Sequence, residues 1–188
     1  MRYLFASLLS CLAATTIAAA DTCPMAPDHS ARLDALILEV QKAPSEAQAR
    51  QISNQMWEIW ADAPNEQSQA ILDRGMSKRA AWDLLGALDD FNRLVDYCPD
   101  YAEGYNQRAF VNFLRQDYAA ALVDLDRALN LSPRHVAAMS GKALSLMGLG
   151  RTGEASLVLD QALKLNPWLP ERNLASPGGP LERKGEDI

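Results

Sequence analysis

Apolar residues recur at intervals of three and four along most of the chain, which places them on one stripe of an α-helix. In residues 102–135 the stripe runs through EGYNQRAFVNFLRQ, breaks once, and resumes in YAAALVDLDRALNLS. Pro133 follows the second stretch, and a proline cannot continue a helix. The pattern predicts an all-α chain built from helical hairpins.

The hairpin pattern repeats with a period of thirty-four residues. The stretch LDRALNLSP at 125–133 returns as LDQALKLNP at 159–167. Three sets of positions keep this interval: Pro99, Pro133 and Pro167; Phe91, Leu125 and Leu159; and Ala87, Ala121 and Ala155. The period defines three units, residues 68–101, 102–135 and 136–167.

These units resemble the tetratricopeptide repeat. The second unit carries the resemblance through Tyr105, Ala109, Ala121, Leu125, Ala128 and Pro133, and the third through Ala143, Gly150, Ala155, Leu159, Ala162 and Pro167. The first unit matches through Gly75, Ala87, Phe91 and Pro99. It departs at Trp82, where the family commonly has glycine, and at Leu94, where a small residue is usual.

The resemblance implies a solenoid whose concave face is lined by the first helix of each unit. The residues expected on that face are Leu72, Met76, Arg79, Asn106, Phe110, Phe113, Ser140, Leu144 and Met147. Some members of the family hold a peptide's terminal carboxylate with Lys, Arg and Asn side chains, and only Arg79 and Asn106 match that chemistry here. An amphipathic helix or other apolar segment is the ligand that this Met- and Phe-rich face favours.

Residues 29–64 read as a further helix pair, split at Pro44 and closed at Pro64. In the repeat frame, Ile52, Met56 and Ile59 fall where later units carry second-helix residues, so we expect a degenerate repeat that caps the array. The cluster of Met56, Trp57, Ile59 and Trp60 suits core packing, although an exposed docking patch is the alternative.

The last segment, residues 168–188, is rich in proline, glycine and charged residues and is expected to be mostly disordered. Trp168 and Leu169 at its start are the exception, because they can cover the open end of the last repeat. They would take the place of the polar capping helix that many such arrays have.

Residues 1–20 have the character of a secretory signal peptide: one early basic residue, an apolar run, and small residues before a cleavage site after Ala20. The apolar run is shorter than the roughly twenty residues that a membrane span needs. Leu8-Leu9-Ser10-Cys11 loosely resembles a lipoprotein box, but cleavage there leaves a very short leader, so lipidation is less favoured. We expect a periplasmic protein that begins with a short segment, residues 21–28.

Cleavage removes Cys11 and leaves Cys23 and Cys98 in an oxidising compartment. A disulfide between them is therefore the favoured state, and two free thiols are the alternative.

Charge and chemistry narrow the function further. The net charge of −6 argues against nucleic acid, whose binding needs clustered Lys and Arg. Gly148-Leu-Gly-Arg-Thr-Gly153 fits a dinucleotide-binding pattern, but a helix precedes it, so a turn between helices is expected. His29 and His135 have no partners at metal-ligand spacing and are expected at the surface.

No enzyme and no cofactor is predicted. The sequence favours a periplasmic interaction module, an adaptor, assembly factor or chaperone-like protein, that binds another exported protein or peptide through its concave face. The alternative is a constitutive structural or accessory subunit of a cell-envelope complex whose groove is filled by the chain itself.

Overall fold

Residues 22–182 are described in a computed structural model, and all regular secondary structure in this part of the chain is helical, as predicted. The expected signal peptide, residues 1–20, lies outside the described residues. The helices are α1 (Ser30–Gln41), α2 (Glu46–Trp60), α3 (Glu66–Ala80), α4 (Leu84–Tyr97), α5 (Ala102–Leu114), α6 (Tyr118–Leu131), α7 (Val136–Gly148), α8 (Thr152–Leu165) and a short 3-10 helix, η1 (Pro170–Leu174). None of the helices within 22–182 has the length and apolar character needed to cross a bilayer.

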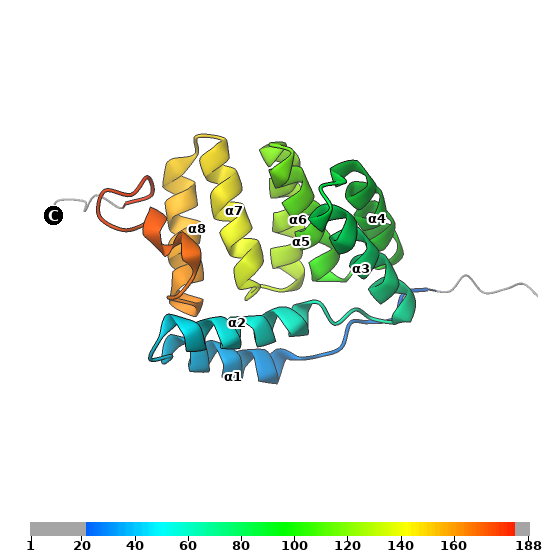
Figure 1. Ribbon diagram of the computed structural model, residues 1–188, viewed down its shortest axis with the longest axis horizontal. Helices are drawn as coiled ribbons and strands as arrows, with labels where there is room; N and C mark the ends of the chain where they lie inside the picture. Colours follow the sequence, from blue (N-terminus) through cyan, green and yellow to red (C-terminus); the bar gives the residue numbers. More distant parts are fainter. Residues whose placement is uncertain (1–21, 183–188) are drawn as a thin grey trace, which may run out of the picture.

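Helices α3 to α8 form three hairpins that stand side by side in one row (Figure 1). The second and third hairpins lie within the units 102–135 and 136–167, whereas the first begins at Glu66, two residues before the predicted start of its unit. The alanines at the repeated position, Ala87, Ala121 and Ala155, are fully buried, which allows close helix approach. Asp83 and Asp117 start the second helices of the first two hairpins by accepting a hydrogen bond from the backbone N–H of Gly86 and Ala120.

Ion pairs repeat with the same period and join the two helices of a hairpin. The Arg74 guanidinium lies 2.8 Å from Asp90, and the Arg108 guanidinium lies 2.6 Å from Asp124. Burial disfavours the charged form of Asp90, but Arg74 and Lys78 outweigh burial and hold the pKa of Asp90 below its usual value. These buried carboxylates fix the pairing of the helices.

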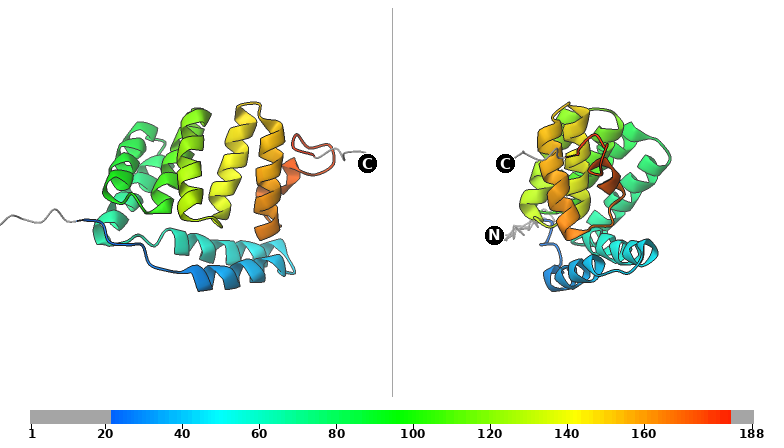
Figure 2. Two further views of the ribbon diagram at one scale, coloured as in Figure 1. Left: turned by 180° about the vertical axis from the view of Figure 1, so that it is seen from behind. Right: turned by 90° about the vertical axis from the view of Figure 1, so that its left-hand side faces the viewer.

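Helices α1 and α2 do not continue the row of hairpins. They lie across the ends of the hairpin helices and run along the row from the first hairpin to the last (Figures 1 and 2). The expectation that residues 29–64 cap the array as a degenerate repeat is therefore wrong about their placement. The apolar stripes of α1 and α2 face each other, with Leu36 and Met56 fully buried between them, and Leu165 and Trp168 from the far end of the chain complete this cluster. We call α1 and α2 the brace.

The brace is attached near the first hairpin by two contacts. Cys23, just before α1, forms the predicted disulfide with Cys98 at the end of α4, and their Cα atoms are 5.2 Å apart. The Tyr101 hydroxyl donates a 2.8 Å hydrogen bond to the Trp60 carbonyl oxygen. Burial raises the pKa of the Tyr101 phenol, so this donor keeps its proton.

The brace is also attached at the opposite end of the row. The Gln41 amide donates a 2.8 Å hydrogen bond to the Lys164 carbonyl, and the Asn166 amide donates a 3.0 Å hydrogen bond to the Ser53 hydroxyl. With both ends held, the brace joins hairpins that otherwise contact only their neighbours.

Residues 168–182, the described part of the tail that was expected to be mostly disordered, are folded, which corrects that expectation for these residues. This segment folds back onto α8, where Leu181 is buried and the Ser156 hydroxyl donates a 3.0 Å hydrogen bond to the Leu181 carbonyl. Trp168 packs into the brace cluster, so this segment covers the end of the array.

Each hairpin turn contains one residue with a positive φ. This residue is Trp82 (φ 65°), Gln116 (φ 62°) and Gly150 (φ 73°) in the three hairpins, in order. Only glycine adopts that conformation without steric cost. Trp82 is 69% exposed, so its side chain gains little packing to offset the strain.

We expect Trp82→Gly to raise the free energy of unfolding by about 0.5–1 kcal/mol. Relief of the left-handed backbone is worth about 1–2 kcal/mol, which exceeds the entropic cost of glycine, about 0.5–1 kcal/mol. The reverse change at the equivalent turn, Gly150→Ala, is the matched control and should destabilise. Urea unfolding measures both variants, and a clear loss of stability in Trp82→Gly would contradict this account.

Candidate functional site

The first helices of the hairpins, α3, α5 and α7, line a cavity of about 390 Å³. Most of its wall is apolar, and a few polar side chains reach it. Its lining residues are Trp57, Arg79, Asn106, Gln107, Ala109, Phe110, Phe113, Leu125, Ala137, Ser140, Gly141, Leu144, Ser145, Leu169, Pro170 and Glu171. We call this cavity the closed groove.

The structure places six of the nine expected groove residues in this wall: Arg79, Asn106, Phe110, Phe113, Ser140 and Leu144. The other three do not line it. Leu72 is fully buried in the core of the first hairpin, and Met76 packs against the same core. Met147 packs against the core of the third hairpin. These three side chains belong to hydrophobic cores and are absent from the cavity wall.

Two segments outside the repeats close the groove. Trp57 enters from α2, and Leu169, Pro170 and Glu171 enter from the turn after α8. Within the aromatic cluster of α2, the structure divides the roles that the sequence left open: Met56 is in the core, whereas Trp57 is 40% exposed and faces the groove. The groove is thus a pocket rather than an open channel.

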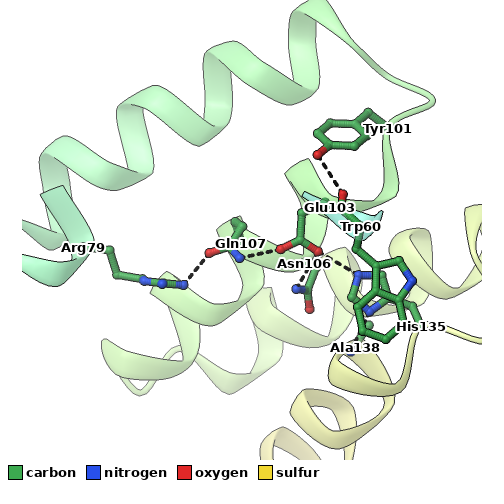
Figure 3. Close-up of polar contacts among 8 residues, drawn as sticks. All are labelled: Trp60, Arg79, Tyr101, Glu103, Asn106, Gln107, His135 and Ala138. Atoms are coloured by element: carbon green, nitrogen blue, oxygen red, sulfur yellow. Dashed lines mark hydrogen bonds and ion pairs between the residues drawn. The ribbon is translucent and has the colours of Figure 1, made fainter. Parts of the chain in front are cut away.

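A buried carboxylate, Glu103, organises the polar floor beside the groove (Figure 3). One of its oxygens accepts hydrogen bonds from the Asn106 amide at 3.0 Å and from the His135 Nε2 at 2.7 Å. The other oxygen accepts from the Gln107 amide. Two donors from α5 and one from the residue that precedes α7 therefore satisfy one charge that is fully removed from water.

His135 is fully buried, which corrects the expectation that it lies at the surface. The backbone N–H of Ala138 donates to its Nδ1 at 3.3 Å, so the ring proton sits on Nε2 and points at Glu103. The Trp60 indole stacks on the imidazole, with ring centroids 4.2 Å apart. His135 therefore joins α5, α7 and the brace at one point.

Arg79 connects this floor to the groove. Its guanidinium donates to the Gln107 side-chain oxygen, and Gln107 in turn donates to Glu103 (Figure 3). The guanidinium also lies 4.6 Å from the centre of the Phe110 ring. Burial lowers the pKa of Arg79, and the negative charge of Glu103 acts in the opposite direction.

The arrangement is suited to binding. Within residues 22–182, no three His, Cys, Asp or Glu side chains come together as a metal site. The glycine pattern at 148–153 is the turn between α7 and α8, as expected, and Gly150 supplies its positive φ. An apolar pocket with a few oriented polar groups is the usual form of a ligand site.

The chain is similar in sequence to proteins that contain tetratricopeptide repeats. A "TPR repeat-containing protein" of Rhizobium etli is 30% identical over 122 residues, which cover 63% of this chain and 58% of that protein. The "Tetratricopeptide repeat protein 36 homolog" of Nematostella vectensis is 46% identical over 65 residues, or 35% of this chain and 36% of that protein. The chain is a tetratricopeptide repeat protein. No family model matches it.

Solved structures share the fold of this tetratricopeptide repeat protein. The first repeat domain of Spaghetti (RPAP3), bound to the HSP90 peptide SRMEEVD, has a TM-score of 0.55 and 21% identity, over 57% of this chain and 86% of that one. The Arabidopsis OM64 repeat domain has a TM-score of 0.56 and 19% identity, over 57% of this chain and 89% of that one.

We expect His135→Ala to lower the free energy of unfolding by about 3 kcal/mol, because it leaves the buried Glu103 carboxylate short of a donor and removes the stack on Trp60. Arg134→Ala is the matched control. Its side chain is 41% exposed and pairs with Asp34, so the loss should stay below about 1 kcal/mol. Equal losses in urea unfolding would show that His135 is not a key contact.

Proposed function

We propose that the protein is a non-catalytic binding module of the bacterial periplasm that holds a short segment of another exported protein in the closed groove. The observation that carries this proposal is the cavity itself. A volume of about 390 Å³ remains in the groove although Trp57 and the turn after α8 form two of its walls. Its apolar wall and oriented polar groups suit a peptide better than a reacting substrate.

Similar structures support a peptide as the ligand class. The Spaghetti domain is bound to an HSP90 peptide, and the second repeat domain of human RPAP3 is in complex with the HSP70 peptide SGPTIEEVD. In the present chain, Trp57 and the turn at 169–171 form part of the groove wall.

The closure limits the size of the ligand. An α-helix with its side chains is about 10 Å wide, so several turns of helix exceed a cavity of about 390 Å³. A short extended segment that inserts one or two apolar side chains suits the space. Of the two ligands that the sequence favoured, an amphipathic helix or another apolar segment, the cavity suits the second.

The periplasmic location rests on the signal-like residues 1–20 and on the disulfide between Cys23 and Cys98. Disulfides persist in oxidising compartments, and this one holds the segment before α1 to the first hairpin. Export to the periplasm accounts for both features, because export uses a leader of this kind and the periplasm is oxidising.

An accessory subunit of an envelope complex remains the second candidate, because Trp57 and Leu169 to Glu171 already occupy part of the groove. In that case the partner binds elsewhere on the surface. The two candidates differ in how binding responds to a change inside the groove.

Phe110→Glu should abolish capture of the partner while leaving the far-ultraviolet circular dichroism unchanged. Phe110 is 43% exposed in the groove, so a charge there disrupts the apolar wall without unfolding the helix. Val123→Glu is the matched control, because Val123 is 71% exposed on α6 and lies outside the groove wall. Capture from envelope extract followed by mass spectrometry measures the effect. A partner retained by Phe110→Glu would favour the accessory subunit.

The full chain, expressed in a Gram-negative host, should be recovered from the periplasm with Asp21 as its first residue. Thiol labelling before reduction should find no free cysteine, because Cys11 leaves with the leader and Cys23 pairs with Cys98. N-terminal sequencing and labelling with a maleimide measure both properties. An uncleaved cytoplasmic protein with free thiols would contradict the proposed location.

A further inference from the structure

Glu171 brings an unpaired carboxylate oxygen into the closed groove. This residue lines the cavity, and its Oε2 is buried without a hydrogen-bond partner among the described residues. Ser140 and Ser145 line the same cavity, are 6% and 0% exposed, and also carry buried hydroxyls without partners. Buried polar groups are normally satisfied, so three in one cavity indicate a ligand that supplies donors and acceptors.

The turn that carries Glu171 is held in place. The Arg172 guanidinium donates to the carbonyl oxygens of Trp168 at 3.0 Å and Leu169 at 3.1 Å, and it pairs with Glu46 of the brace at 3.1 Å. Pro170 begins the 3-10 helix η1 and fixes φ at the first position of this turn. The carboxylate of Glu171 is therefore positioned by its neighbours rather than carried on a free loop.

The other charge in the groove is already engaged. Arg79 contacts Gln107 and Phe110, and its positive charge faces the buried Glu103. Glu171 is thus the groove's unbalanced charge, on a chain whose net charge is −6. A positively charged ligand group complements both the site and the whole molecule.

We propose that the closed groove recognises a basic-apolar peptide segment: an apolar side chain packs between Phe110 and Leu144 while a neighbouring Lys or Arg side chain pairs with Glu171. The hydroxyls of Ser140 and Ser145 bond to the peptide backbone. This assignment of ligand chemistry rests on the proposed function of the groove.

Two synthetic probes test the charge directly. Both are tripeptides with acetyl and amide ends, Lys-Leu-Leu and norleucine-Leu-Leu, which differ only in the side-chain ammonium. Isothermal titration calorimetry measures their affinity for the mature wild-type protein and for Glu171→Gln. Glu58→Gln is the matched control, because it makes the same charge change at an exposed site on α2 beside Trp57 but outside the groove wall.

Wild type and Glu58→Gln should bind the lysine probe about tenfold more tightly than the norleucine probe, as a charge-assisted hydrogen bond provides. Glu171→Gln should remove that preference and leave the norleucine affinity unchanged. Equal affinity of the two probes for wild type would overturn the proposal and leave the proposed function standing.

Three other results distinguish failure of this proposal from failure of the proposed function. Binding of both probes to Phe110→Glu at wild-type strength would overturn the groove itself as the binding site. Failure of both probes to bind wild type would overturn a short basic-apolar segment as the ligand. Self-association of wild type, but not of Glu171→Gln, in sedimentation velocity would make a second copy the occupant and also overturn it.

Discussion

The buried carboxylate of Glu103 is the contact on which the rest of the structure depends, because three separate parts of the chain meet there. Helix α5 supplies Glu103, the start of α7 supplies His135, and the brace supplies the Trp60 ring that covers the imidazole. A charge without water needs a full set of donors, and here α5 and the start of α7 supply them while the Trp60 ring of the brace covers the imidazole. The charge therefore makes the fold specific to one arrangement of these parts.

Closure of the groove follows from the same arrangement. A row of repeats contacts only its nearest neighbours and leaves an open concave channel. Here the brace crosses that row and is held at Cys98, at His135 and at Asn166, so Trp57 is positioned at the groove. The turn after α8 is tied to the brace through Arg172 and supplies the opposite wall. The binding surface common to this fold thus becomes a pocket with a defined size and polarity.

The repeats were predictable because their information is periodic. A thirty-four-residue interval identifies the small residue at each helix crossing, as at Ala121, and places Phe110 and Leu144 on the concave side. The brace lacks that period. Ile52 and Met56 matched the repeat frame because any amphipathic helix presents such a stripe, and the sequence did not reveal that α1 and the end of α8 cover it.

The residues whose positions the sequence did not predict have one physical cause in common, which is packing by distant parts of the chain. His135 follows a proline at a repeat junction, a position that is usually exposed, and it is buried only because Trp60 arrives from a distant part of the chain. The tail is rich in proline and glycine, yet Leu181 packs into the core cluster of the third hairpin and Arg172 holds the turn. The sequence around Glu171 does not indicate a place in the groove, because long-range packing alone brings this residue there.

Native-state hydrogen exchange tests most directly whether the brace and the repeats form one cooperative unit. The account predicts that slowly exchanging amides in α1 and α2 open with the same free energy as those in α5 and α7, because the Glu103 contact is lost only when all of them separate. Exchange of α1 and α2 at a much lower free energy, with α5 and α7 still protected, would contradict it. The brace would then be a loosely attached segment, and the groove would open independently of global unfolding.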